Sequence, residues 1–90
     1  MKSEFLNGVY FIGIGGISMS SLALILKNNG AKVGGYDFKR SENTELLEKN
    51  GIKVNYEYND TNQDGFDTVV YTAAIVEDDK EFLIAKKRQH

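Results

Sequence analysis

The sequence lacks the residues on which several classes of protein depend. It contains no cysteine, which excludes disulfides and thiolate metal sites. Its one histidine, His90, is the last residue, so we expect neither a metal ligand nor a catalytic base there. The 11 basic and 13 acidic residues give a formal net charge of -2 without any basic cluster. This charge pattern argues against a nucleic-acid partner.

Long apolar segments are also missing. The N-terminus has no apolar signal-peptide core, because Phe5 and Leu6 are followed at once by Asn7 and Gly8. No apolar run approaches the roughly 20 residues that cross a bilayer as a helix. We therefore expect a cytoplasmic protein that has no membrane partner. The length of 90 residues allows one small domain.

The most informative stretch is residues 9–20, which read V-Y-F-I-G-I-G-G-I-S-M-S. The first four predict a buried parallel strand, because they are β-branched or aromatic. Glycines follow, and apolar residues then recur at helical spacing at Met19, Leu22, Ala23 and Leu26. A strand, a glycine turn and a helix in this order predict a phosphate cradle. Glycines let the backbone approach an anion, and the first N–H groups of a helix have no internal partner.

This cradle is the predicted site for a diphosphate group. Backbone N–H groups are expected to bind it, together with a hydroxyl from Ser18 or Ser20, and a Cβ added at Gly15 is expected to fill the cradle. The alternative is a glycine turn that only packs the helix against the sheet. The predicted binding residues of this stretch are Gly13, Gly15, Gly16, Ile17, Ser18, Met19 and Ser20.

A second part of the predicted site follows later strands. Residues 31–37 predict a strand that ends at Asp37, about 20 residues after the glycines, where dinucleotide-binding folds carry a ribose-binding acid. The alternative for Asp37 is a cap on the next turn. Residues 67–72 predict a further strand, and the small residues after it place Thr72, Ala73 and Ala74 at the same ligand crevice. We expect Asp37 to accept hydrogen bonds from the ribose hydroxyls or a base N–H of a nucleotide, with these three residues beside it.

The remaining pattern completes an α/β domain. The glycine pair at residues 34–35 indicates a close approach, either of a backbone or ligand or of a packed helix. Gly30 is expected to end the first helix. Ser41 is expected to cap a short helix that ends at Gly51 and makes its apolar contact through Leu46 and Leu47. Residues 52–58 alternate as an edge strand, and Asp78 and Asp79 begin a last helix. The predicted fold is a Rossmann-like three-layer α/β domain with a mostly parallel sheet of at least four strands.

The longer string around the glycines resembles the start of the Mur ligases. The resemblance includes residues 11–20 and continues through residues 30–37, Ser41, Thr44 and residues 67–75. It therefore covers nearly the whole chain with the family's spacing. The sequence departs from the family pattern at Ser18, Tyr36 and Tyr58, where the family usually has glycine, serine and often histidine.

The resemblance implies an ATP-dependent, amide-forming ligase of peptidoglycan precursor synthesis. In this family a muramate carboxylate is phosphorylated by ATP, and an amine then attacks the acyl phosphate in a Mg²⁺-dependent step. Residues 1–90 are then expected to be the N-terminal domain that binds UDP-N-acetylmuramate, with Asp37 and residues 72–74 beside the uridine or the sugar. The central ATP-binding domain and the C-terminal domain are its expected partners, since no G-x-x-x-x-G-K-[ST] motif occurs here. We expect no catalytic or metal-binding residue in this chain and no activity from it alone.

Two other classes of protein share part of this pattern. One is the NAD(P)- or FAD-binding domain of an oxidoreductase, which the glycine fingerprint with Asp37 alone would favour. The other is a regulatory nucleotide-binding module without catalysis. The extra glycine at Gly16 and the pair Met19 and Ser20 favour the ligase, and so a UDP-sugar rather than NAD.

Overall fold

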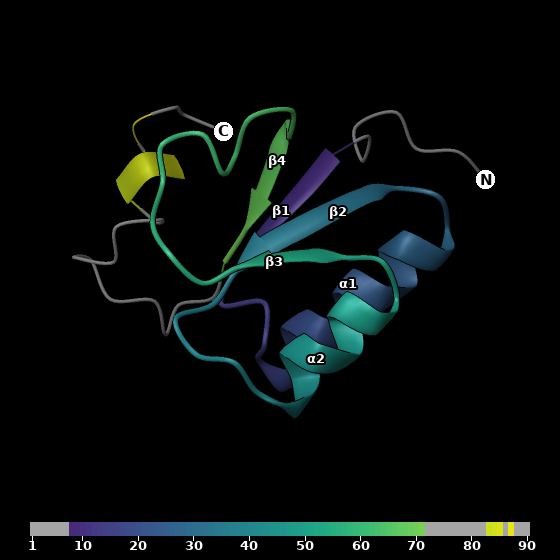
Figure 1. The fold of residues 1–90 in the computed structure, drawn as a ribbon. Coiled ribbons are helices and arrows are strands. Elements are labelled where there is room, and N and C mark those ends of the chain that lie inside the picture. The colour runs from purple at the N-terminus through teal and green to yellow at the C-terminus, as the bar shows by residue number, and fades with distance from the viewer. Residues whose placement is uncertain (1–7, 72–82, 86, 88–90) are drawn as a thin grey trace.

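Four parallel strands form the centre of the structure (Figure 1). The computed structural model describes residues 8–71, 83–85 and 87. The elements along the described chain are β1 (Gly8–Ile12), α1 (Ile17–Asn28), β2 (Lys32–Tyr36), α2 (Glu42–Lys49), β3 (Lys53–Asn55) and β4 (Thr68–Val70). All three strand pairings are parallel, in the order β3-β2-β1-β4. The predicted α/β fold with a parallel sheet is confirmed.

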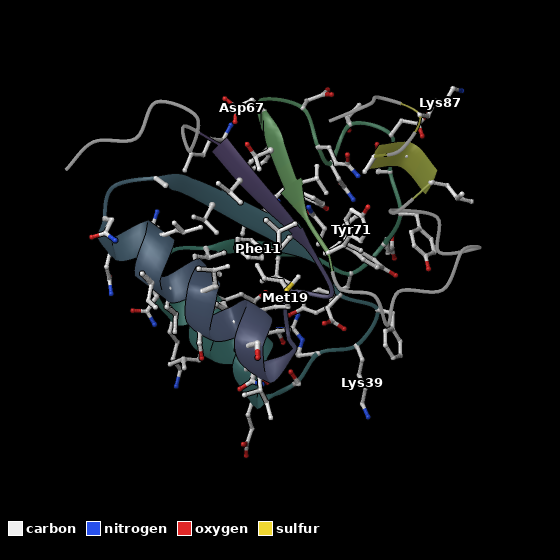
Figure 2. All side chains as sticks on the ribbon, turned by 180° about the vertical axis from the view of Figure 1, so that it is seen from behind. Phe11, Met19, Lys39, Asp67, Tyr71 and Lys87 are labelled. Carbon is white, nitrogen blue, oxygen red and sulfur yellow. The ribbon has the colours of Figure 1, made fainter. Side chains whose placement is uncertain are left out.

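Helices α1 and α2 lie side by side on one face of the sheet, and residues 83–85 lie on the other (Figure 1). The side chains of β1 contribute to both faces of the sheet, because successive side chains of a strand point to opposite sides. Phe11 faces α1, from which Met19 points toward the sheet (Figure 2). Tyr10 and Ile12 pack on the opposite face with Ala85. The sheet is therefore the middle of three layers.

Strand β1 is the axis of this arrangement. All five of its residues are buried, as expected for a strand that has neighbours on both edges and layers on both faces. The chain runs outward from β1 to β2 and β3, then returns to place β4 on the other side of β1. The strand order therefore reverses next to β1. In open α/β sheets, ligands bind beyond the carboxyl ends of the strands at such a reversal.

The glycine pair in β2 makes room for neighbouring side chains. A Cβ at Gly35 would lie 2.6 Å from both the Ile14 Cδ1 atom and the Phe11 carbonyl oxygen. A Cβ at Gly34, on the opposite face, would lie 2.8 Å from the Phe66 ring. None of these contacts is with a helix, so the packed-helix alternative does not explain them; Gly35 approaches the backbone of β1, as the first alternative states, and Gly34 approaches the ring of Phe66.

Both helices end in the same way. Gly30 and Gly51 have φ angles of 93° and 84°, and the amide of the residue after each glycine donates to a carbonyl five residues back. This arrangement satisfies carbonyls that the helix itself leaves open. At the start of α2, the side chains of Ser41 and Thr44 form a capping box. The predicted cap at Ser41 and the predicted helix ends at Gly30 and Gly51 are confirmed.

Other details differ from the prediction. Leu22 and Leu46 were expected to face the core but are 40% and 46% exposed, while Ala23 and Leu47 beside them are fully buried. Helical spacing defines a stripe without defining its edges, so residues at the border of the stripe are misassigned. The edge strand β3 is confirmed but covers only Lys53–Asn55. Residues 83–85 and 87 are helical, whereas the predicted helix start at Asp78 and Asp79 lies outside the described residues.

We predict that Gly35→Ala destabilises the domain by about 2 kcal/mol or more, because the added Cβ meets backbone as well as the Ile14 side chain. The free energy of unfolding in urea measures this. The control is Gly16→Ala, whose Cβ would have no neighbour closer than 3.5 Å and which should cost about 1 kcal/mol or less. Equal losses for both variants would contradict the packing argument.

Candidate functional site

The glycine loop between β1 and α1 is fixed by the end of β2. The amides of Gly13 and Ile14 both donate to the Tyr36 carbonyl oxygen, at 2.8 and 3.0 Å. Gly13 has a φ angle of 81°, a conformation that favours glycine over every other residue. The chain therefore turns away from the sheet directly after Ile12 and enters α1 at Ile17.

The carboxylate of Asp37 continues this attachment. Its Oδ2 atom accepts the amide of Gly15 at 2.8 Å, and its Oδ1 atom accepts the amide of Lys39 at 3.2 Å. The structure thus brings Asp37 and the glycine loop together, as predicted, across 22 positions of sequence. Asp37 also stabilises the turn that follows it, so the capping alternative describes part of its role.

The start of α2 encloses Gly15 from a third side. A Cβ at Gly15 would lie 2.8 Å from Asp37 Oδ2 and 2.9 Å from Thr44 Cγ2. The expectation that it would fill the cradle is therefore wrong, because it would point into the protein. The Asn43 side-chain amide also donates to the Gly15 carbonyl oxygen at 2.8 Å. Sequence reasoning missed Asn43, since no local pattern links two residues 28 positions apart.

Three amides at the start of α1 stay available. Gly16 N–H donates to the Gly13 carbonyl, and Ser20 N–H to the Gly16 carbonyl. Between them, the amides of Ile17, Ser18 and Met19 donate to no acceptor in the described part of the chain. They are the unsatisfied donors of a helix start, at the positive end of its dipole.

The two helix starts near the loop differ in charge. The first turn of α2 carries Glu42 and Glu45, and Ser41 caps it. The first turn of α1 carries no acidic residue, and its N-cap residue Gly16 has no side chain to accept a hydrogen bond. The amides of Glu42 and Asn43 at the start of α2 also donate to no acceptor in the described part of the chain, but the acidic side chains of that turn repel an anion, whereas the start of α1 carries no such charge.

Side chains contribute little at this helix start. Ser18 is exposed, as is Ile17 with 82% of its surface accessible. Met19 belongs to the hydrophobic core, and the buried Ser20 hydroxyl donates to the Ile17 carbonyl oxygen at 3.1 Å. The available polar groups are thus backbone amides and the Ser18 hydroxyl. Thr72, Ala73 and Ala74 lie outside the described residues.

Other kinds of site were sought in the same part of the structure. Residues 8–71, 83–85 and 87 contain no group of three metal-ligating acidic or histidine side chains. No described helix has both the length and the apolar character needed to cross a membrane.

This combination of features defines a class. A parallel α/β domain, with a glycine loop before an open helix start and an acid at the end of the next strand, has the architecture of a nucleotide-binding domain. The family model described as "Mur ligase family, catalytic domain" matches residues 8–90. The chain belongs to the Mur ligase family.

Similar sequences agree with this assignment. The chain is 50% identical over 82 residues to a UDP-N-acetylmuramate–L-alanine ligase from Caldicellulosiruptor bescii. The aligned region covers 91% of this chain and 18% of that relative. It is 42% identical over 87 residues to the enzyme of the same name from Clostridium acetobutylicum. That aligned region covers 97% of this chain and 19% of the relative. The chain therefore spans about a fifth of the length of these relatives.

Similar structures belong to the same group. The UDP-N-acetylmuramate–alanine ligase from Thermotoga maritima matches with a TM-score of 0.83 and 34% identity, over 91% of this chain and 19% of that one. The UDP-N-acetylmuramate:L-alanyl-γ-D-glutamyl-meso-diaminopimelate ligase from Neisseria meningitides matches with a TM-score of 0.78 and 26% identity, over 93% and 27%. Because the matching structures are ligases, they do not support the alternative of an oxidoreductase domain or of a regulatory nucleotide-binding module.

We predict that Asp37→Asn loosens the glycine loop. An asparagine side chain retains one acceptor, so its NH₂ group would face either the Gly15 or the Lys39 amide. The expected loss is about 1–2 kcal/mol of unfolding free energy, with faster hydrogen exchange at the Gly15 amide. The control is Glu57→Gln, whose exposed carboxylate accepts no hydrogen bond within the described residues. Unchanged exchange at Gly15 would contradict the role given to Asp37.

Proposed function

We propose that this chain binds UDP-N-acetylmuramate as the N-terminal domain of a UDP-N-acetylmuramate–L-alanine ligase of peptidoglycan precursor synthesis. The observation that carries the proposal is the row of three available amides, at Ile17, Ser18 and Met19, beyond the carboxyl end of β1. The two relatives with that name, at 50% and 42% identity, support this substrate over other nucleotides.

In this proposal the diphosphate is the group that lies at the start of α1. The three amides donate to its oxygens, and the helix dipole favours its negative charge. Gly16 keeps the approach to the backbone open, since it has no side chain. The exposed Ser18 hydroxyl is one further donor at the same turn.

Asp37 is proposed to contact the uridine or the sugar. Each of its carboxylate oxygens accepts one backbone amide, and each has lone-pair capacity for a second donor. A ribose hydroxyl or a base N–H could therefore donate to Asp37 without displacing the glycine loop. Thr72, Ala73 and Ala74 remain part of this proposal, because they follow β4, which pairs with β1.

Amide formation would need groups beyond those that bind the UDP-sugar. Phosphoryl transfer requires a cradle for the β- and γ-phosphates, a lysine and a metal-holding hydroxyl. The sequence has no motif of that type, and its one glycine cradle is assigned here to the UDP-sugar. We therefore propose that further domains of the ligase bind ATP with Mg²⁺ and the L-alanine. Residues 1–90 would bind and orient the substrate.

We predict that Ser18→Asp abolishes most of this binding without destabilising the domain. A carboxylate in the first turn of α1 interacts favourably with the helix dipole but repels a diphosphate bound at the same amides. Coulomb repulsion at this range corresponds to a roughly ten-fold or larger rise in Kd. Isothermal calorimetry with UDP-N-acetylmuramate measures the Kd, and thermal unfolding measures the stability.

Two matched variants separate charge from shape. Ser18→Asn has nearly the same volume as aspartate without its charge, and Ser21→Asp places the same charge on an exposed position one turn further along α1. Both should bind more tightly than Ser18→Asp. Equal affinity of Ser18→Asp and the wild type would exclude the start of α1 as the diphosphate site.

A further inference from the structure

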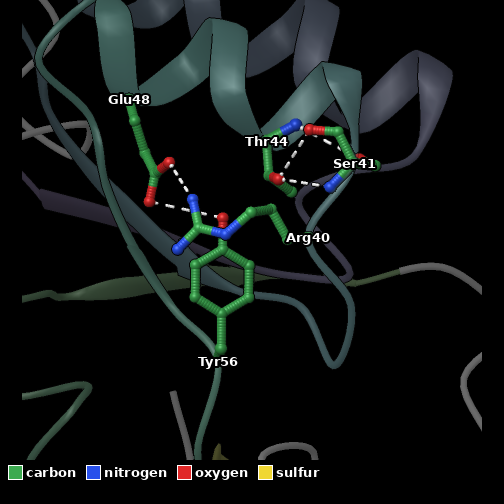
Figure 3. Close-up of polar contacts among 5 residues, drawn as sticks. All are labelled: Arg40, Ser41, Thr44, Glu48 and Tyr56. Carbon is green, nitrogen blue, oxygen red and sulfur yellow. Dashed lines mark hydrogen bonds and ion pairs between the residues drawn. The ribbon is translucent and has the colours of Figure 1, made fainter.

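Arg40 lies in the loop between β2 and α2 and contacts side chains from two other parts of the domain. Its guanidinium group pairs with Glu48 on α2 at 2.9 Å and stacks over the Tyr56 ring at 4.6 Å (Figure 3). The Tyr56 hydroxyl donates in turn to the second Glu48 carboxylate oxygen at 3.3 Å. Three side chains, from a loop, a helix and the residue after β3, therefore form one cluster.

This cluster fixes the loop of residues 38–40, together with the Asp37 carboxylate that accepts the Lys39 amide. Between Asp37 and the helix cap at Ser41 lie three residues, and Phe38 is 78% exposed. Lys39 extends away from the domain (Figure 2), and its side chain makes no hydrogen bond or ion pair within the described residues. Within the described residues, Arg40 is the one residue of these three whose side chain makes an ion pair or a ring contact with another part of the domain.

The loop joins the two groups that hold Gly15. Asp37 at its start accepts the Gly15 amide, and Asn43, two residues after Ser41, donates to the Gly15 carbonyl. Arg40 directly precedes the capping box of Ser41 and Thr44 (Figure 3). A shift of Arg40 would therefore be transmitted to both contacts with the glycine loop.

We propose that Arg40 is a positioning residue for the diphosphate site, acting through Asp37 and Asn43 on the glycine loop. The inference rests on the proposed function, since it concerns the same site. The planar guanidinium group is essential to the role, because it stacks on Tyr56 and pairs with Glu48 at once. A lysine would keep the charge and lose the stacking geometry.

The experiment compares Arg40→Ala, Arg40→Lys and Tyr56→Leu in the 90-residue chain. Calorimetry gives the Kd for UDP-N-acetylmuramate, and hydrogen exchange gives the protection of the Gly15 and Lys39 amides without ligand. The control is Lys49→Ala, which removes one positive charge from an exposed side chain that makes no hydrogen bond in the described structure. Thermal unfolding verifies that each variant is folded.

We expect Arg40→Ala to raise Kd by about five-fold, the scale of an exposed ion pair combined with a cation–π contact, and Arg40→Lys and Tyr56→Leu, which lose the cation–π contact but keep the positive charge at position 40, to raise Kd by about two- to three-fold. The Gly15 and Lys39 amides should exchange several-fold faster, while the amides of β1 keep their protection. Lys49→Ala should behave as the wild type.

The two readouts separate the possible failures. If Arg40→Lys has the Kd and the amide exchange rates of the wild type, Arg40 contributes no more than a surface charge. That result would overturn the inference and leave the proposed function intact. If the wild type does not bind the UDP-sugar, the proposed function fails, and the inference fails with it as a statement about a diphosphate site. Faster Gly15 exchange in Arg40→Ala would then show only that Arg40 orders the loop.

Discussion

The attachment of the glycine loop to the end of β2 is the contact on which the rest of the site depends. The Tyr36 carbonyl accepts the amides of Gly13 and Ile14, and the next residue, Asp37, accepts the amide of Gly15. Hydrogen bonds to a charged acceptor are worth about 1.5–3 kcal/mol, more than those between neutral groups. The loop is therefore held in place by the protein before any ligand arrives.

This attachment divides the backbone amides into two groups. Those of Gly13, Ile14, Gly15 and Gly16 bind acceptors within the protein, and those of Ile17 to Met19 remain for a ligand. A glycine-rich loop is usually described as a cradle in its entirety. Here the glycines shape the turn and allow close packing, while we propose that the diphosphate binds at the first turn of α1. A preformed loop loses little conformational entropy on binding, which favours affinity.

The sequence alone predicted the local features. The strand, glycine turn and helix around residues 9–28, the cap at Ser41 and the ends at Gly30 and Gly51 follow from short-range patterns. Apart from the position of Asp37 near the glycine loop, contacts between distant segments could not be predicted, because no pattern gives the direction of a side chain across the fold. The inward direction of a Gly15 Cβ, the bond from Asn43 and the stacking of Arg40 on Tyr56 are of this kind.

The most direct test of this account is a crystal structure of the chain with UDP-N-acetylmuramate. We predict diphosphate oxygens within hydrogen-bond distance of the amides of Ile17, Ser18 and Met19, with the bond from Gly15 to Asp37 retained. A complex in which the Gly15 amide leaves Asp37 to bind the diphosphate would contradict the preformed loop. A diphosphate bound away from α1 would contradict the site itself.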